Sequence, residues 1–164
     1  MRLRKTSWIA LSGIVWFVVG FGLLTLGLRF VVEFARFNVS DTTSLIAQLT
    51  PIAGGREQAA MALIMIGLII GFIKGRFVLV KTVRRVTERI LKLPEPVKFN
   101  QVYSRGYLFL IAGMIALGVS MKWLHVPQDI RGMVDVAVGS ALMNGAMLYF
   151  RLALTISKEQ KQAR

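Results

Sequence analysis

The chain has 164 residues and no cysteine, and hydrophobic side chains make up 55% of it. It nevertheless carries 21 Lys and Arg against 8 Asp and Glu, a net charge of +13. A soluble domain of this length would not bury so many apolar side chains, and the missing cysteines exclude disulfides and thiolate metal sites. Because most Phe and Trp lie in uncharged stretches, away from the Lys and Arg, nucleic acid is not the expected partner.

The first apolar stretch runs from Thr6 to Leu28, 23 residues without a charge. At ~1.5 Å per residue, a helix of this length covers a ~30 Å hydrocarbon core. A basic N-terminus precedes it, but the stretch is too long for a signal peptide and no cleavage pattern follows. The sequence therefore predicts a first transmembrane span over about residues 7–32.

Three further apolar runs follow: Gln58–Ile73, Gly106–Met121 and Gly132–Phe150, the last interrupted only by Asp135. They predict spans over about residues 57–75, 104–122 and 130–151, and hence an all-α polytopic membrane protein with four transmembrane helices in a single domain, residues 1–164. Sixteen Lys and Arg lie in the two termini and in the connection from Lys74 to Arg105, against five in the other connections. This bias predicts cytoplasmic N- and C-termini.

The first outer connection carries a short helix signal. Ser40 or Asp41 could cap a helix that ends near Leu49, before Pro51. Its apolar residues would share one face, so we expect the segment to lie on the outer membrane surface.

The connection after the second span is the most regular part of the sequence. Its apolar residues recur at spacings of four and three, which places them on one face of a helix: Leu79, Val83, Val86, Ile90 and Leu93. This predicts an amphipathic cytoplasmic helix over about residues 76–92, ended by Pro94.

The basic residues of this helix are the candidate lipid-binding residues: Lys81, Arg84, Arg85, Arg89 and Lys92. Near an anionic membrane surface each contributes ~1 kcal/mol of binding, so membrane lipids with anionic headgroups are the expected partner. The alternative is that these charges only set topology, on a helix packed against the ends of the spans.

Two ladders of small residues mark surfaces for close helix packing: Gly67, Gly71 and Gly75 on the second span, and Ala137, Ala141 and Gly145 on the fourth. Such ladders serve contacts within one chain or between two copies. We expect a homo-oligomer, or a subunit of a membrane complex, that uses these surfaces.

Polar residues on the fourth span indicate a possible transport path formed by Asp135, Asn144 and Tyr149. Asp135 has a simpler interpretation as a helix-end acid beside Arg131, and Asn144 as a hydrogen-bonding contact between helices.

Catalytic and metal-binding patterns are missing from the sequence. His125 is the only histidine, and no nucleophile–base set or phosphate loop can be assembled. Two pairs of methionines, Met61/Met65 and Met143/Met147, are better explained by flexible packing than by copper binding. We expect no enzyme, no cofactor and no metal site.

The block from Gly75 to Arg85, GRFVLVKTVRR, with Arg89-Ile90 and Leu93-Pro94 after it, resembles small bacterial four-span proteins of uncharacterised activity. The likeness covers mainly the second span, the basic helix and the start of the third span. It implies a bacterial inner membrane and brings no activity. The first span lacks the glutamate of small multidrug transporters, and the chain lacks the cysteines of thiol-oxidising quinone reductases.

The first hypothesis is therefore a small non-enzymatic membrane protein that self-associates and contacts anionic lipid or a partner through its basic helix. The second is an oligomeric channel or transporter.

Overall fold

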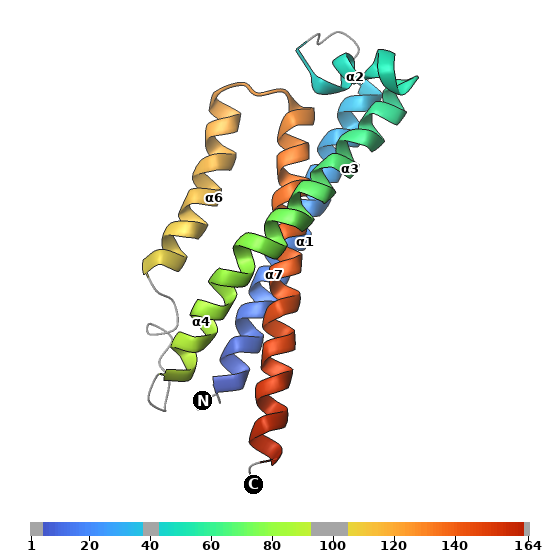
Figure 1. Ribbon diagram of the computed structural model, residues 1–164. Helices are drawn as coiled ribbons and strands as arrows, with labels where there is room; N and C mark the ends of the chain where they lie inside the picture. The colour runs from blue at the N-terminus through green and yellow to red at the C-terminus, as the bar shows by residue number, and fades with distance from the viewer. Residues whose placement is uncertain (1–4, 38–42, 93–104, 163–164) are drawn as a thin grey trace.

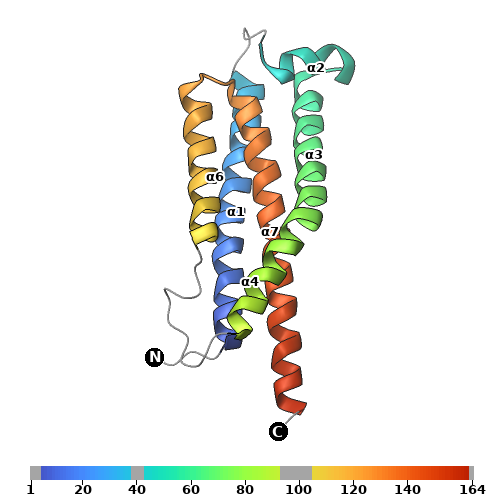
Figure 2. The ribbon, with the colours of Figure 1, turned by 60° about the vertical axis from the view of Figure 1, so that its left-hand side comes forward.

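A computed structural model describes residues 5–37, 43–92 and 105–162, and every element in these ranges is helical. The elements are α1 (Lys5–Phe37), α2 (Leu45–Ala53), α3 (Arg56–Lys74), a π-helical turn η1 (Gly75–Leu79), α4 (Val80–Lys92), α6 (Arg105–Trp123) and α7 (Gln128–Gln162). The helices form an elongated bundle in which α7 lies between α1 and α3, while α6 stands to one side (Figures 1 and 2). Both termini lie at one end, here called the terminal end, and α2 covers the other (Figure 1). The expected all-α class is confirmed.

Three helices among the described residues are long and apolar enough to cross a membrane: Ser7–Phe37, Arg56–Phe77 and Gln128–Lys158. They correspond to the first, second and fourth predicted spans. The predicted span at about 104–122 is a helix of 19 residues, α6, and it is not among the three. The side chains of residues 105–111 lie outside the described part of the chain, so the structure supports a membrane-type protein with three candidate spans.

The most extensive contact in the bundle joins α1 and α7, which run antiparallel. Glycines repeat every seven residues on both helices: Gly13, Gly20 and Gly27 on α1, and Gly132 and Gly139 on α7. A Cβ atom built on Gly27 would lie 2.6 Å from the Gly132 carbonyl oxygen, and one on Gly139 would lie 2.6 Å from the Leu24 nitrogen. The two backbones therefore touch, and a seven-residue repeat keeps the contact along both helices.

The ladder on α3 packs against α7 of the same chain. A Cβ on Gly67 would lie 3.1 Å from the Met133 carbonyl oxygen, and one on Gly75 would lie 2.9 Å from the Cα of Ala141. Because residue numbers rise together on the two helices, α3 and α7 run parallel. In Figure 1, α3 crosses α7 obliquely, as expected for four-residue ladders.

Every fourth residue is buried from α3 into α4, wherever side chains are described: Ala59, Leu63, Gly67, Gly71, Gly75, Val83 and Thr87. On a regular α-helix, a four-residue repeat drifts around the axis by about 40° per step. The wider turn of η1, five residues long, counters this drift because π-helix has more residues per turn. The second span thus continues into α4 without leaving the bundle, where a plain α-helix had been expected from residue 76.

The short outer helix differs from the prediction in its cap and its end. Ser40 and Asp41 lie outside the described residues, and the cap is Ser44, whose hydroxyl accepts a 3.0 Å hydrogen bond from the Ala47 N–H. The helix continues through Pro51 to Ala53. Its buried face packs against the adjacent ends of α1 and α3 within one apolar cluster.

Substitution of the heptad glycines should separate α1 from α7. In Gly27→Leu or Gly139→Leu, the new side chain meets backbone atoms that cannot move aside, and we expect the free energy of unfolding to fall by about 1–3 kcal/mol or more. Thermal unfolding in detergent, followed by circular dichroism, measures the loss. Gly22→Leu is the matched control, because nothing lies within 4 Å of a Cβ there; an equal loss in all three variants would contradict the assignment.

Candidate functional site

The amphipathic helix α4 is held against the bundle by its apolar face. Val83 is 2% exposed and belongs to a core cluster with Trp8 of α1 and Tyr149 of α7. Thr87, one turn later, is 4% exposed. The described part of the apolar face of α4 therefore packs against the bundle near its terminal end. As a result, the opposite face of α4 points away from the bundle.

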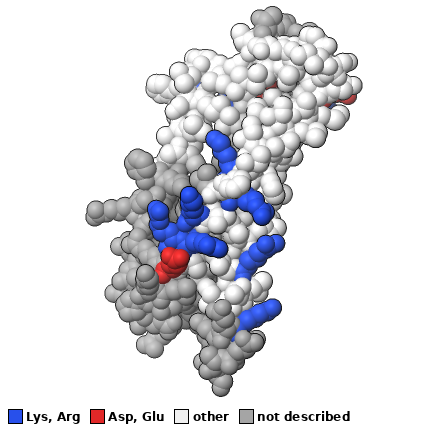
Figure 3. All heavy atoms as spheres, viewed as in Figure 1, with Lys and Arg blue, Asp and Glu red and all other residues white. Residues whose placement is uncertain are grey.

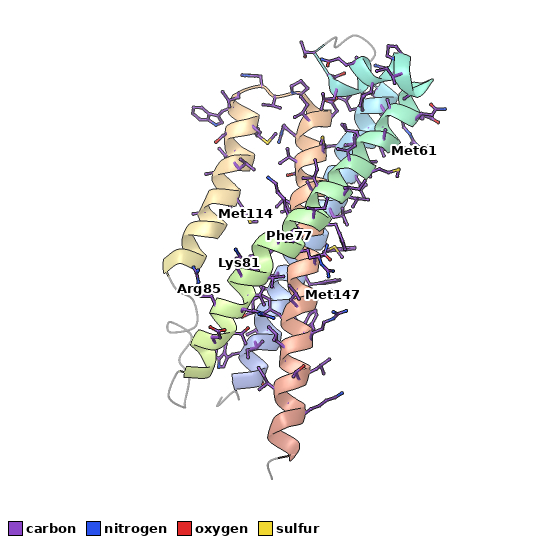
Figure 4. The ribbon with its side chains drawn as sticks, viewed as in Figure 1. Met61, Phe77, Lys81, Arg85, Met114 and Met147 are labelled. Carbon is purple, nitrogen blue, oxygen red and sulfur yellow. The ribbon has the colours of Figure 1, made fainter. Side chains whose placement is uncertain are left out.

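The opposite face of α4 is basic and exposed. Lys81, Arg84 and Arg85 are exposed, with Glu88 beside them; Lys81 and Arg85 project from the same side of the helix (Figure 4). The side chains of Arg89 and Lys92 lie outside what the structure describes. In Figure 3, the coloured Lys and Arg side chains lie mainly over the half of the bundle nearer the terminal end, and largely uncharged atoms cover the other half.

Further exposed cations extend this basic surface. Lys74 and Arg76 precede it at the junction of α3 and η1, and Arg151 and Lys158 lie on the terminal half of α7. We call Lys81, Arg84 and Arg85, together with these four residues, the basic face.

The predicted packing ladders are occupied within the chain. Gly71 faces the Ala137 carbonyl oxygen and the Ser140 hydroxyl, and Gly75 faces Ala141. Gly145, the third member of the α7 ladder, is buried. Both ladders therefore stabilise the contact between α3 and α7.

The three residues of the predicted transport path lie in different surroundings. Asp135 lines a cavity between α1, α6 and α7, whereas Asn144 lines a shallow groove beside Phe72 of α3. Tyr149 is 0% exposed and packs against Trp16, with ring centroids 6.4 Å apart. Nine residues turn a helix by about 900°, which places Asp135 and Asn144 on opposite sides of α7. The described residues do not bring the three together.

Asn144 finds its hydrogen-bond partner in its own helix. Its amide donates a 3.0 Å hydrogen bond to the Ser140 carbonyl oxygen, and the Ser140 hydroxyl donates one of 3.1 Å to the Ala137 carbonyl oxygen. The expected contact between helices is therefore replaced by bonds along α7.

The cavity that Asp135 lines has a volume of about 480 Å³. Its walls are almost entirely apolar side chains of α1, α6 and α7, and Arg131 is the second charged residue in the lining. The guanidinium carbon of Arg131 lies 5.4 Å from the ring centroid of Phe30. This space is partly open and lies between helices, and of its lining residues only Asp135 and its neighbour Arg131 stood out in the sequence.

Asp129 is a second residue that sequence reasoning missed. It is 0% exposed, and its carboxylate accepts hydrogen bonds from the N–H of Ile46 at 3.0 Å and of Ile130 at 2.8 Å. The N-termini of α2 and α7 therefore converge on one carboxylate, which both helix dipoles favour. An acid two residues after Pro127, in the first turn of a predicted helix, was a helix-start signal that could have indicated it.

The remaining sequence candidates do not assemble into a site. Met61, Met65 and Met147 are exposed, and Met61 and Met147 lie far apart along the bundle (Figure 4). His125 is exposed in the turn before α7. Within the described ranges, no three His, Asp or Glu side chains lie close enough to hold a metal ion.

Comparison with known proteins finds no matching family model, no similar curated protein and no similar solved structure.

Removal of the Asp129 carboxylate should release α2 locally. Asp129→Ala leaves the buried Ile46 N–H without its acceptor, a loss of about 1–3 kcal/mol. We expect amide hydrogen exchange within Leu45–Ala53 to rise about tenfold or more, while exchange in α1 is unchanged. Asp129→Asn keeps an acceptor oxygen, so its exchange rate in α2 should lie between those of the native protein and Asp129→Ala. An unchanged exchange rate in Asp129→Ala would contradict the role assigned to Asp129.

Proposed function

We propose that this chain is a non-enzymatic four-span protein of a bacterial inner membrane, with both termini in the cytoplasm, that holds its basic face against anionic headgroups of the cytoplasmic leaflet. The observation that carries the proposal is the fixed position of α4. Val83 and Thr87 are buried against the bundle while Lys81, Arg84 and Arg85 stay exposed. A mobile surface helix would present no such defined array of charges.

The direction of the helices supports α6 as the fourth span. Gly67 meets Met133, and Gly75 meets Ala141, so α3 and α7 run parallel. Two parallel spans need an odd number of crossings between them, and α6 is the helix that the structure describes between α4 and α7. Its 19 residues cover ~28 Å, close to the ~30 Å hydrocarbon core.

Exposed apolar side chains support the depth of the bundle in the bilayer. On α1 they extend from Ile14 to Phe37, and on α3 and η1 from Met61 to Phe77. Lys74 and Arg76 lie in the last turn of this belt and Lys81 follows Phe77 by one turn, so the basic face starts at the end of the belt. Cations at the end of the apolar belt reach the lipid headgroups. The N-terminal part of α1 lies beyond the belt and packs with α4 rather than with lipid.

Self-association through the two ladders is not part of this proposal, because both ladders are occupied by contacts between α3 and α7. A channel is not proposed either, since Asp135 and Asn144 lie on opposite sides of α7.

Single cysteines can test the number of crossings, since the chain has none of its own. We expect Gln48→Cys and His125→Cys to react with an impermeant thiol reagent in intact cells. Ser7→Cys and Lys158→Cys should react only after permeabilisation. All four positions are exposed. If α6 does not cross, Lys158→Cys would react from outside, and the four-span topology would be wrong.

Neutralising the basic face should weaken its preference for anionic lipid. In reconstituted bilayers, spin-labelled phosphatidylglycerol should associate more strongly than phosphatidylcholine with the native protein. The triple variant Lys81→Gln/Arg84→Gln/Arg85→Gln should lose this preference by up to roughly fivefold per residue, from ~1 kcal/mol each, and less at high salt.

The matched control for the lipid experiment is Arg29→Gln/Arg36→Gln, which removes two exposed cations from the outer part of α1. It should leave the preference for phosphatidylglycerol in the cytoplasmic leaflet unchanged. An unaltered preference in the triple variant, or an equal loss in the control, would remove the lipid contact from the proposal.

A further inference from the structure

The cavity between α1, α6 and α7 extends along the helices and has charged residues at one end only. Val15 and Leu142 line one end, and Leu26 and Arg131 line the other. The eleven residue-to-residue steps from Val15 to Leu26 span ~16 Å of helix. A volume of about 480 Å³ lies within the range of natural ligand sites, which is about 300–1,000 Å³.

The cavity exists because α6 does not approach its neighbours as the other helices do. Among the described residues, α6 has no extended backbone contact with another helix. A Cβ built on Gly113 or Gly118 would meet nothing within 4 Å, in contrast to Gly20 and Gly27 on α1. Met114 of α6 packs against the α1–α7 core and lines the space (Figure 4).

The polar end of the cavity carries one charge of each sign. Arg131 and Asp135 are one turn apart on α7 and both contribute to the lining. A guanidinium matches a phosphate, and a carboxylate accepts hydrogen bonds from an ammonium group. A ligand with both groups beside a hydrocarbon chain complements the whole cavity.

We propose that this cavity is a binding site for a phospholipid with a primary-amine headgroup. One acyl chain lies between α1, α6 and α7, the phosphate contacts Arg131, and the ammonium contacts Asp135. The site goes beyond the basic face, lies at the other end of the predicted spans, and needs only that these three helices are in the bilayer.

Trp16 provides a reporter, because it lines the cavity and is 4% exposed. The full chain, carrying Trp123→Phe to remove an exposed indole, is purified in lipid-free detergent. It is titrated with phosphatidylethanolamine whose acyl chains carry bromine, which quenches indole fluorescence on contact. We expect saturable quenching, at least about tenfold tighter than with phosphatidylcholine or phosphatidylglycerol of the same chains, as for a hydrogen-bonded charged group.

Two glycines of α6 separate filling of the cavity from general damage. Gly118 lines the cavity and Gly113 does not, yet a Cβ meets nothing at either position. Gly118→Leu should abolish saturable quenching, and Gly113→Leu should leave it intact. Equal quenching in both variants would overturn the proposed acyl-chain site.

Headgroup recognition is tested without changing the packing. In Asp135→Asn, the affinity for phosphatidylethanolamine should fall to within about twofold of the affinity for phosphatidylcholine. Arg131→Gln should weaken the binding of all three phospholipids, because each has a phosphate. If native protein binds the three lipids equally, or binds a brominated alkane as well, the cavity holds hydrocarbon only and the headgroup assignment is wrong. In the Lys81→Gln/Arg84→Gln/Arg85→Gln variant, brominated phosphatidylethanolamine should quench indole fluorescence as in the native protein. The cavity site and the basic face can therefore fail independently of each other.

Discussion

The contact between the backbones of α1 and α7 is the constraint on which the rest of the bundle depends. Helices in hydrocarbon gain little from burying apolar side chains against each other, because lipid tails are equally apolar. Their association rests on close packing, and glycine allows the closest approach. At Gly20, Gly27, Gly132 and Gly139, a Cβ would fall within 3.0 Å of backbone or side-chain atoms of the other helix. The seven-residue spacing extends this fit along both helices.

The same helix, α7, must also receive α3 and α4 on a different face, and that face follows a different repeat. Small residues every four positions favour an oblique crossing, whereas the seven-residue repeat favours a small crossing angle between the helix axes. The second span would rotate off α7 after a few turns if it stayed a regular α-helix. The π-helical turn at Gly75–Leu79 offsets that rotation, and Val83 and Thr87 return to the buried face. The position of the basic face therefore follows from a backbone irregularity inside the second span.

Much of this architecture could be predicted from the sequence, and the failures have identifiable causes. Uncharged runs located the long helices, and the alternation of apolar and basic residues predicted which side of α4 is exposed. The ladder at Gly67, Gly71 and Gly75 was visible, but its partner was not, because spacing alone does not say which helix lies opposite. The heptad glycines were missed because a four-residue pattern was sought. The separation of Asp135 from Asn144 could have been calculated from helical geometry.

Sequence patterns could not indicate that α6 packs less closely than the other helices. Its apolar run resembles those of the three candidate spans, and it also contains glycines, but Gly113 and Gly118 face open space instead of a neighbouring backbone. An empty apolar volume between α6 and the other helices would cost its lining side chains their dispersion contacts. In a bilayer, the nearest material that can restore those contacts is a lipid chain. In the lipid site proposed above, α1 and α7, which are joined by the glycine contacts, form one wall, and α6, which has no such contact, forms the other.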